Sequence, residues 1–314
     1  MADRGNAATR WATGLRRLAY LLLATALLAA SGCVWLDTKQ RNIIYRPSPG
    51  VPADFAGLRA GDERFFVDVP AAFAAPVNAP ANTPSAPGTA TPQQIEMWWL
   101  PHANPVAPTL LYYHGTFRNL YQNLPKIDAL REAGFSILAV DYRGWGRSTS
   151  IVPSELTILQ DANLAFAQLR LREPRASHRV LYGHSMGSGV AVDIASRLQA
   201  PADYAAVILE SAFTSFPDIA KEASWLGGLA KVLNNERFAS IDKISQVQAP
   251  LLMLHGRLDT TVPIRLGEKL FAAARAPKQW HAIDGAAHSD LQKAGSVQYQ
   301  SALLAFKNTY LLGR

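Results

Sequence analysis

Apolar runs rich in β-branched and aromatic residues alternate along most of this chain with segments of helical periodicity. The apolar runs predict strands of a sheet that is covered on both faces. They lie at Glu63–Val69, Ile95–Leu100, Thr109–Tyr113, Phe135–Val140, Val180–Tyr182, Ala205–Leu209, Leu251–Leu254 and Gln279–Ile283. The periodic segments predict helices near Asn123–Ala133, Ile158–Arg172, Met186–Gln199, Ile264–Ala274 and Val297–Leu311.

The order of these elements predicts the α/β class, with a mostly parallel eight-stranded sheet and helices on both faces. A strand that is followed by a helix returns parallel to its neighbour in such folds. The first two strands have no helix between them, so we expect them to pair antiparallel at one edge. Residues 33–312 are enough for one domain with a sizeable core.

The strand at Val180 runs into Gly183-His184-Ser185-Met186-Gly187, a G-x-S-x-G sequence followed by a helical segment. This arrangement predicts a nucleophile elbow, a tight turn that lifts one serine hydroxyl above the sheet. Gly183 and Gly187 keep side chains out of the gap between strand and helix. Ser185 is therefore the candidate nucleophile, and a purely structural glycine-rich turn is the alternative.

A serine nucleophile needs a base, and the base needs an acid that orients it. In this kind of fold the acid and then the histidine follow the serine along the chain. Of the seven histidines, His288 combines that order with a loop of small residues after a strand. Asp259 lies in a loop just beyond the strand Leu251–Leu254, and Glu210 is the alternative acid.

Acyl transfer also needs N–H donors that hold an oxyanion. We expect one from Met186, directly after the serine, and one from the loop after the strand Thr109–Tyr113. In that loop we assign Thr116, with Phe117 as the alternative. An ordinary loop with no such role is the competing interpretation.

Two further segments contain charged or apolar side chains whose role the sequence alone does not decide. Arg143 and Arg147 follow a strand and could meet an anionic substrate group, but we favour a structural loop with solvated charges. Residues 213–245 contain several aromatic and aliphatic side chains, which either line an acyl pocket or pack the segment onto the sheet.

Taken together as an ordered set, these motifs resemble the α/β-hydrolase fold. Within it the chain resembles a small-cap group that includes eukaryotic depalmitoylating serine hydrolases and uncharacterised bacterial relatives. The resemblance implies a minimal cap at 213–245 and a serine hydrolase that cleaves carboxylic ester or thioester bonds without a cofactor. The chain departs from the group's usual small-residue loop at Thr116-Phe117-Arg118. The motifs are His114-Gly115, Asp141–Ser148, Gly183–Gly187, Glu210–Ser215, His255–Asp259 and Gly285–His288.

The first 32 residues have the pattern of a bacterial lipoprotein signal peptide. Four arginines precede an apolar stretch from Leu18 to Ala30, which is too short to span a bilayer comfortably. Small residues then lead to Cys33, the chain's one cysteine and the expected lipid attachment site. A plain cleaved signal peptide or an uncleaved tether are the alternatives. Val34 follows the cysteine, in place of the aspartate that retains lipoproteins in the inner membrane of many bacteria. We therefore expect the protein at the outer membrane of the cell envelope, facing the periplasm.

Composition narrows the remaining function classes. Removing residues 1–32, which hold four arginines and one aspartate, lowers the net charge from +7 to +4, too little to predict nucleic-acid binding. No metal-ligand spacing, P-loop or dinucleotide fingerprint occurs. Residues 70–92 form an uncharged Pro/Ala-rich insert that we expect to be a loop without function. A peptidase or amidase with the same catalytic residues, or a catalytically silent envelope lipoprotein, remain as alternatives to an esterase.

Overall fold

The computed structural model describes residues 35–74, 92–116, 118–222 and 236–312, together with residues 20, 25, 31 and 32. Cys33, most of the expected leader and residues 75–91 of the insert lie outside the described residues. In the described part of the chain, no helix is both long enough and apolar enough to cross a membrane. The leader, the lipid anchor and the role of the insert therefore stay predictions.

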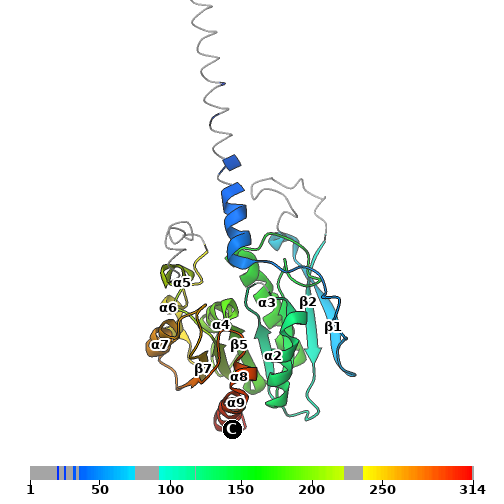
Figure 1. The fold of residues 1–314 in the computed structure, drawn as a ribbon. Helices are drawn as coiled ribbons and strands as arrows, with labels where there is room; N and C mark the ends of the chain where they lie inside the picture. Colours follow the sequence, from blue (N-terminus) through cyan, green and yellow to red (C-terminus); the bar gives the residue numbers. More distant parts are fainter. Residues whose placement is uncertain are drawn as a thin grey trace, which may run out of the picture.

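The described residues form one eight-stranded sheet with the order β1-β2-β4-β3-β5-β6-β7-β8 (Figure 1). β1 pairs antiparallel with β2 at the edge, as predicted, and β2 is also antiparallel to β4. The strands from β4 to β8 are parallel. Their bounds are Glu63–Val69, Gln93–Leu100, Thr109–Tyr113, Ser136–Asp141, Arg179–His184, Ala206–Glu210, Leu251–Gly256 and Lys278–Ile283, within three residues of the predicted ends.

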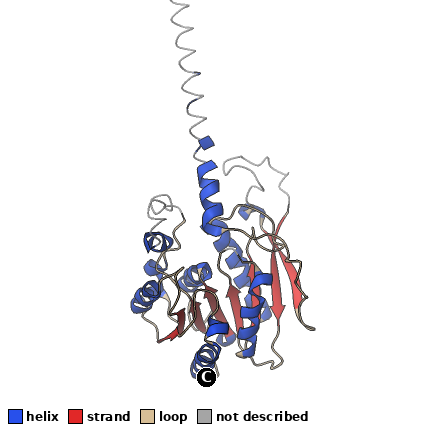
Figure 2. Ribbon diagram, viewed as in Figure 1, coloured by secondary structure: helices blue, strands red, loops and turns tan. Residues whose placement is uncertain are grey.

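Helices cover both faces of this sheet, as predicted (Figure 2). The five expected helices are α2 Leu120–Glu132, α3 Glu155–Arg172, α4 Met186–Arg197, α7 Ile264–Ala273 and α9 Ser296–Tyr310. The 213–245 segment, whose length leaves room for two short helices, contains α5 Phe216–Glu222 and α6 Ser240–Lys243 in its described part. The sequence did not predict the short helix α8 Leu291–Ala294 or the 3₁₀ turns Ala71–Phe73, Ala176–His178 and Ile244–Gln246. Elements of one or two turns carry too few periodic positions to be recognised.

Each face of the sheet has its own apolar core. On one side, side chains of α3, α4 and α7 pack against the sheet, for example Ile158, Val190 and Leu270. On the other side α2 and α9 do the same, through residues such as Ile127 and Phe306. The strands between them are almost wholly buried, which explains why they read as continuous apolar runs rather than alternating ones.

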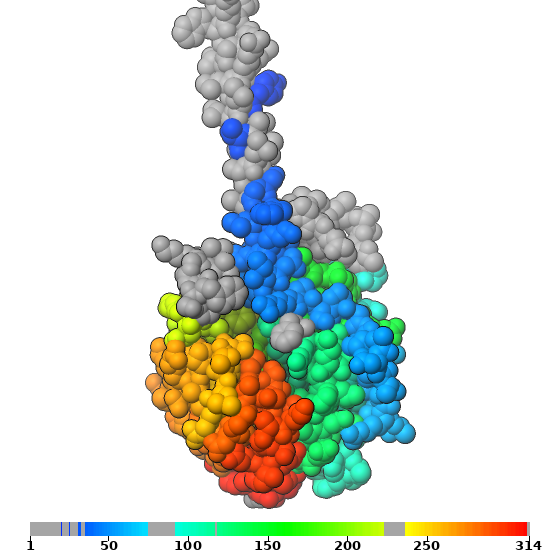
Figure 3. Space-filling view, in the orientation of Figure 1, coloured from blue at the N-terminus to red at the C-terminus, as the bar shows by residue number. Residues whose placement is uncertain are grey.

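Residues 35–45 form a further helix that the sequence did not predict. It ends in Tyr45, which is fully buried and meets the rings of Phe216 and Phe238 at centroid distances of 6.2 and 6.4 Å. Tyr45 also donates a hydrogen bond to Glu236. In the space-filling view this segment, in blue, projects from one end of the domain, with its lower part against the domain (Figure 3). The N-terminal helix is therefore joined to the domain by a buried aromatic contact.

Candidate active site

Ser185 stands at the turn between β5 and α4, as the G-x-S-x-G pattern predicts. Its backbone has φ 54° and ψ −123°, a left-handed conformation that a residue with a β-carbon rarely adopts. Its N–H donates to the carbonyl of Glu210 at 2.9 Å, which ties the strained turn to β6. Strain held by surrounding structure is a common property of functional positions.

The glycines on either side of the serine allow the elbow to close. A β-carbon on Gly183 would lie 2.1 Å from the carbonyl oxygen of Gly187, and one on Gly187 would lie 2.0 Å from that of Tyr113. Both distances are far inside van der Waals contact. No larger residue fits at either position without moving β3, β5 or α4 apart.

The structure brings Ser185, His288 and Asp259 into one hydrogen-bonded chain. His288 Nε2 lies 2.9 Å from Ser185 Oγ, and His288 Nδ1 lies 2.8 Å from Asp259 Oδ2. The three side chains come from the loops after β5, β8 and β7, at the carboxyl edge of the sheet. These distances are those of a base within reach of a nucleophile and oriented by an acid.

Asp259 is held ionised by its surroundings. Its Oδ1 accepts the N–H groups of Thr261 and Val262 at 2.9 and 2.8 Å, and His255 Nε2 lies 3.4 Å from its Oδ2. Burial opposes ionisation, but the hydrogen bonds from His255, His288 and the backbone outweigh it, so the pKa of Asp259 falls well below its usual range. A fixed negative charge therefore faces His288 Nδ1, which donates its hydrogen to it.

A second set of contacts positions the backbone of His288. His184 Nε2 lies 3.1 Å from the His288 carbonyl oxygen, and Ser211 Oγ donates to the same oxygen at 3.0 Å. Burial lowers the pKa of His184 to about 3, so its ring is neutral and its Nε2 carries the donated hydrogen. His184, which the sequence shows only as the variable residue of the elbow, thus holds the loop that carries His288.

Glu210, the alternative acid, lies elsewhere in the network. It is fully buried and accepts hydrogen bonds from Lys126, Tyr182 and Tyr299. Burial would raise its pKa, but Lys126 outweighs this effect and holds the pKa below its usual range. Its carboxylate is therefore paired beneath the site, while Asp259 is the carboxylate that contacts His288.

The loop after β3 lies directly against the elbow. A β-carbon on Gly115 would lie 3.0 Å from Cβ of Ser185, and the next residue, Thr116, lines the same cavity as Met186. Asn119 ends this loop as the N-cap of α2, in a reciprocal capping box with Gln122. His114 Nδ1 donates to the Gly115 carbonyl at 2.6 Å, which holds the start of this loop. Phe117 lies outside the described residues.

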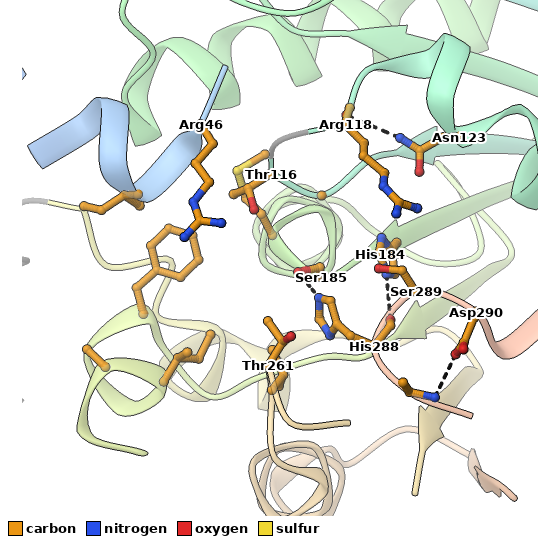
Figure 4. Close-up of a pocket in the computed structure, with 18 of the residues that line it drawn as sticks. Arg46, Thr116, Arg118, Asn123, His184, Ser185, Thr261, His288, Ser289 and Asp290 are labelled. Atoms are coloured by element: carbon orange, nitrogen blue, oxygen red, sulfur yellow. Dashed lines mark hydrogen bonds between the residues drawn. The ribbon is translucent and has the colours of Figure 1, made fainter. Parts of the chain in front are cut away.

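Ser185 and His288 face a cavity of about 640 Å³ (Figure 4). Part of its wall is apolar and comes from the N-terminal helix, from α5 and from the Asp259 loop, through Ile43, Ile44, Phe216, Ile219, Ala220 and Val262. Phe213 and Phe238 of the 213–245 segment pack in the core instead. The described part of the 213–245 segment therefore both lines the cavity and packs against the sheet. Residues 223–235 lie outside the described residues.

The loop after β4 is structural, as the sequence favoured, but the expected solvation of its charges holds for Arg147 and is wrong for Arg143. Arg143 is fully buried, and its guanidinium bonds Asp161 at 2.8 Å and Gln93 at 2.7 Å. Arg147 is exposed and lies over the ring of Phe66. Neither lines the cavity.

The sequence missed other residues that build this site. His184 and Ser211 contact His288 from positions 104 and 77 residues away, and the N-terminal helix supplies a wall to a site formed by the rest of the chain. Their local sequences carry no motif for these roles. A polar side chain at the carboxyl end of a parallel strand is the weak signal that could have marked His184 and Ser211.

The sequence is similar to a known protein family and to individual known proteins. A family model described as serine aminopeptidase, S33, matches residues 104–245. An uncharacterised protein of Mycobacterium tuberculosis is 31% identical over 299 residues, 93% of this chain and 96% of that protein. Human alpha/beta hydrolase domain-containing protein 17B is 32% identical, over 65% of this chain and 67% of its own.

Solved structures show the same fold at low identity. An esterase from Pyrococcus furiosus superposes with a TM-score of 0.61 at 14% identity, covering 84% of this chain and 98% of that one. Est1E from Butyrivibrio proteoclasticus, solved with ferulic acid bound, gives a TM-score of 0.56 at 17% identity, covering 70% and 96%. These likenesses establish the architecture only.

Proposed function

This chain belongs to the α/β-hydrolase family, and from that premise we propose that it is a serine hydrolase of carboxylic ester or thioester bonds. The observation that carries the proposal is the chain of hydrogen bonds from Asp259 through His288 to Ser185, at 2.8 and 2.9 Å. It opens onto a cavity with an apolar wall, which suits an acyl chain.

In the proposed reaction Ser185 Oγ attacks the acyl carbonyl while His288 Nε2 takes its proton. The N–H groups of Met186 and Thr116 hold the oxyanion, and the first lies at the start of α4, where N–H groups have no partner within the helix. His288 then protonates the departing alcohol or thiol, which leaves an acyl group on Ser185. A water attacks this acyl-enzyme, gives its proton to His288, and the acid leaves as Ser185 regains its hydrogen.

The alternative is an aminopeptidase, which the description of the matching family model favours. Such an enzyme must hold the substrate's N-terminal ammonium group with a carboxylate. Among the described lining residues, Asp290 is the carboxylate, and its Oδ1 already accepts the Ala287 N–H at 2.7 Å. Two arginines, Arg46 and Arg118, line the same cavity and repel a cation. The charge of the cavity therefore favours acyl ester or thioester substrates.

A fluorophosphonate probe tests the proposal, since it reacts with an activated serine. We expect wild-type protein to be labelled and Ser185→Ala to be unlabelled. Ser196→Ala is the matched control, because Ser196 lies in the same helix but outside the cavity, and it should label like wild type. Unlabelled wild type would favour the silent-lipoprotein alternative. Comparing p-nitrophenyl esters with aminoacyl anilides then separates an esterase from a peptidase.

We further propose that Cys33 is lipidated and tethers the enzyme to the bacterial envelope, at the outer membrane facing the periplasm. The arginine-rich start, the apolar stretch and the small residues before Cys33 support this. Several acyl chains would anchor the protein stably. Metabolic labelling with a palmitate analogue should tag wild type and spare Cys33→Ser. An untagged wild type would exclude the lipid anchor without touching the hydrolase proposal.

A further inference from the structure

The cavity above Ser185 has an apolar part and a polar part. In Figure 4 the labelled polar residues Arg118, Asn123, Ser289 and Asp290 gather on one side of Ser185, and Arg46 reaches in from the opposite side. The apolar part is suited to an acyl chain. The polar part, together with Arg46 on the facing side of Ser185, is then left for the group on the other side of the scissile bond.

Arg46 occupies a position where its side chain is unfavourable for the backbone. It follows the last residue of the N-terminal helix, has φ 45°, and donates its N–H to the Asn42 carbonyl at 3.0 Å. This is the left-handed cap that helices usually assign to glycine, because a β-carbon is strained there. An arginine at such a position, with its side chain in the active-site cavity, indicates that the side chain has a function.

Arg118 enters the cavity from the loop that precedes α2. Its N–H donates to the Thr116 carbonyl at 2.8 Å, and its own carbonyl accepts Asn123 Nδ2 at 3.3 Å. The backbone is therefore held on both sides. In Figure 4 its guanidinium extends from this loop toward the space beside His184.

We propose that Arg46 and Arg118 bind an anionic group, a phosphate or a carboxylate, on the leaving group of the acyl substrate. The inference rests on the proposed hydrolase function and names its substrate class. A guanidinium offers paired N–H donors that match the oxygens of either anion. Asp290 is the opposing charge among the described lining residues, so two cations outnumber one carboxylate. His288 protonates the oxygen or sulfur of the leaving group. This group then departs as an alcohol or thiol that still carries its phosphate or carboxylate.

A matched pair of substrates isolates this effect. Monodecanoylglycerol and decanoylglycerol 3-phosphate share the acyl chain and the ester, and differ only in the phosphate. We expect wild type to hydrolyse the phosphate ester with a kcat/KM at least about tenfold higher than that for monodecanoylglycerol. This is the gain in binding free energy that one charge-assisted hydrogen bond provides. Arg46→Gln and Arg118→Gln should each lower the ratio of the two constants by roughly tenfold. Added salt should also lower it, because it screens the attraction. A decanoyl ester with a carboxylate leaving group distinguishes carboxylate from phosphate recognition.

Two variants separate binding from folding. Arg147→Gln removes the same charge from an exposed position outside the cavity and should leave the ratio unchanged. Arg46→Gly relieves the left-handed backbone, so it should unfold at the same or a higher temperature than wild type while the ratio falls.

The inference is overturned if wild type hydrolyses neither the phosphate ester nor the carboxylate ester faster than monodecanoylglycerol, or if the arginine variants keep the wild-type ratio of the preferred anionic ester to monodecanoylglycerol. Fluorophosphonate labelling that depends on Ser185 would leave the proposed hydrolase function standing in each of these cases. Loss of that labelling would instead remove the proposed function itself. The two failures are therefore distinguishable.

Discussion

Replacing Gly187 by alanine tests whether the elbow and the loop after β3 must touch for the site to work. The new β-carbon would lie 2.0 Å from the Tyr113 carbonyl oxygen, 2.6 Å from its carbon and 2.8 Å from the His114 oxygen. Ordinary contact begins near 3.4 Å, so the two segments must separate by about 1.4 Å, the difference from 2.0 Å. Backbone atoms supply all three contacts, and no rotamer change relieves them.

The expected effect on stability is moderate and the effect on activity is large. Overpacking of this kind costs about 1–3 kcal/mol, and alanine recovers about 1 kcal/mol over glycine in a helix. The net loss of up to about 2 kcal/mol lowers the melting temperature by up to about 8 °C. The separation also moves Thr116 away from Ser185, and losing one oxyanion donor lowers kcat by roughly 10²–10³.

Gly189→Ala is the matched control for this prediction. It adds the same methyl group to the same helix, but its β-carbon would meet the ring of Phe238 at 3.0 Å, and a side chain can shift by a few tenths of an ångström. We expect a stability change within about 1 kcal/mol and activity near wild type. Urea unfolding and p-nitrophenyl ester kinetics measure both variants. Activity of Gly187→Ala within about threefold of wild type would refute the reasoning.

Three further predictions follow from the polar contacts. Asp259→Asn should lower kcat on the order of 10⁴-fold with little change in fold, measured by ester kinetics and circular dichroism, and a loss below tenfold would contradict its role. Lys126→Met should cost about 3–5 kcal/mol in urea unfolding, because it leaves the buried Glu210 carboxylate unpaired, and adding Glu210→Gln should restore most of the loss. Because the Asp259 pKa is depressed on folding, its stabilisation is complete above its unfolded pKa of about 3.9 and is lost as the pH falls below it. The free energy of unfolding, measured with urea at a series of pH values, should therefore fall more steeply on acidification for wild type than for Asp259→Asn. Parallel pH dependences of the two proteins would argue against the assigned hydrogen bonds.

The sheet and its main helices could be predicted because their signals are local. Runs such as Thr109–Tyr113 are apolar over their whole length, and a strand that is buried on both faces needs nothing else. The prediction of Ser185, His288 and Asp259 rested on the same logic, since the carboxyl ends of parallel strands meet at one edge. By contrast, the helix over residues 35–45 was missed, because its place depends on Tyr45 packing against distant rings.

The sequence by itself therefore determined the fold class, the order of the elements and the loops that carry the candidate chemistry. Only the tertiary structure decided that Asp259 rather than Glu210 contacts His288, because Glu210 is paired with Lys126 under the sheet edge. It also brought Arg46 and Arg118 into the cavity, which no pattern in the sequence indicated, while Arg143 and Arg147 lie outside it. The physical reason is that side-chain contacts join residues far apart in the chain, and the direction of a side chain depends on the packing around it rather than on its neighbours in sequence.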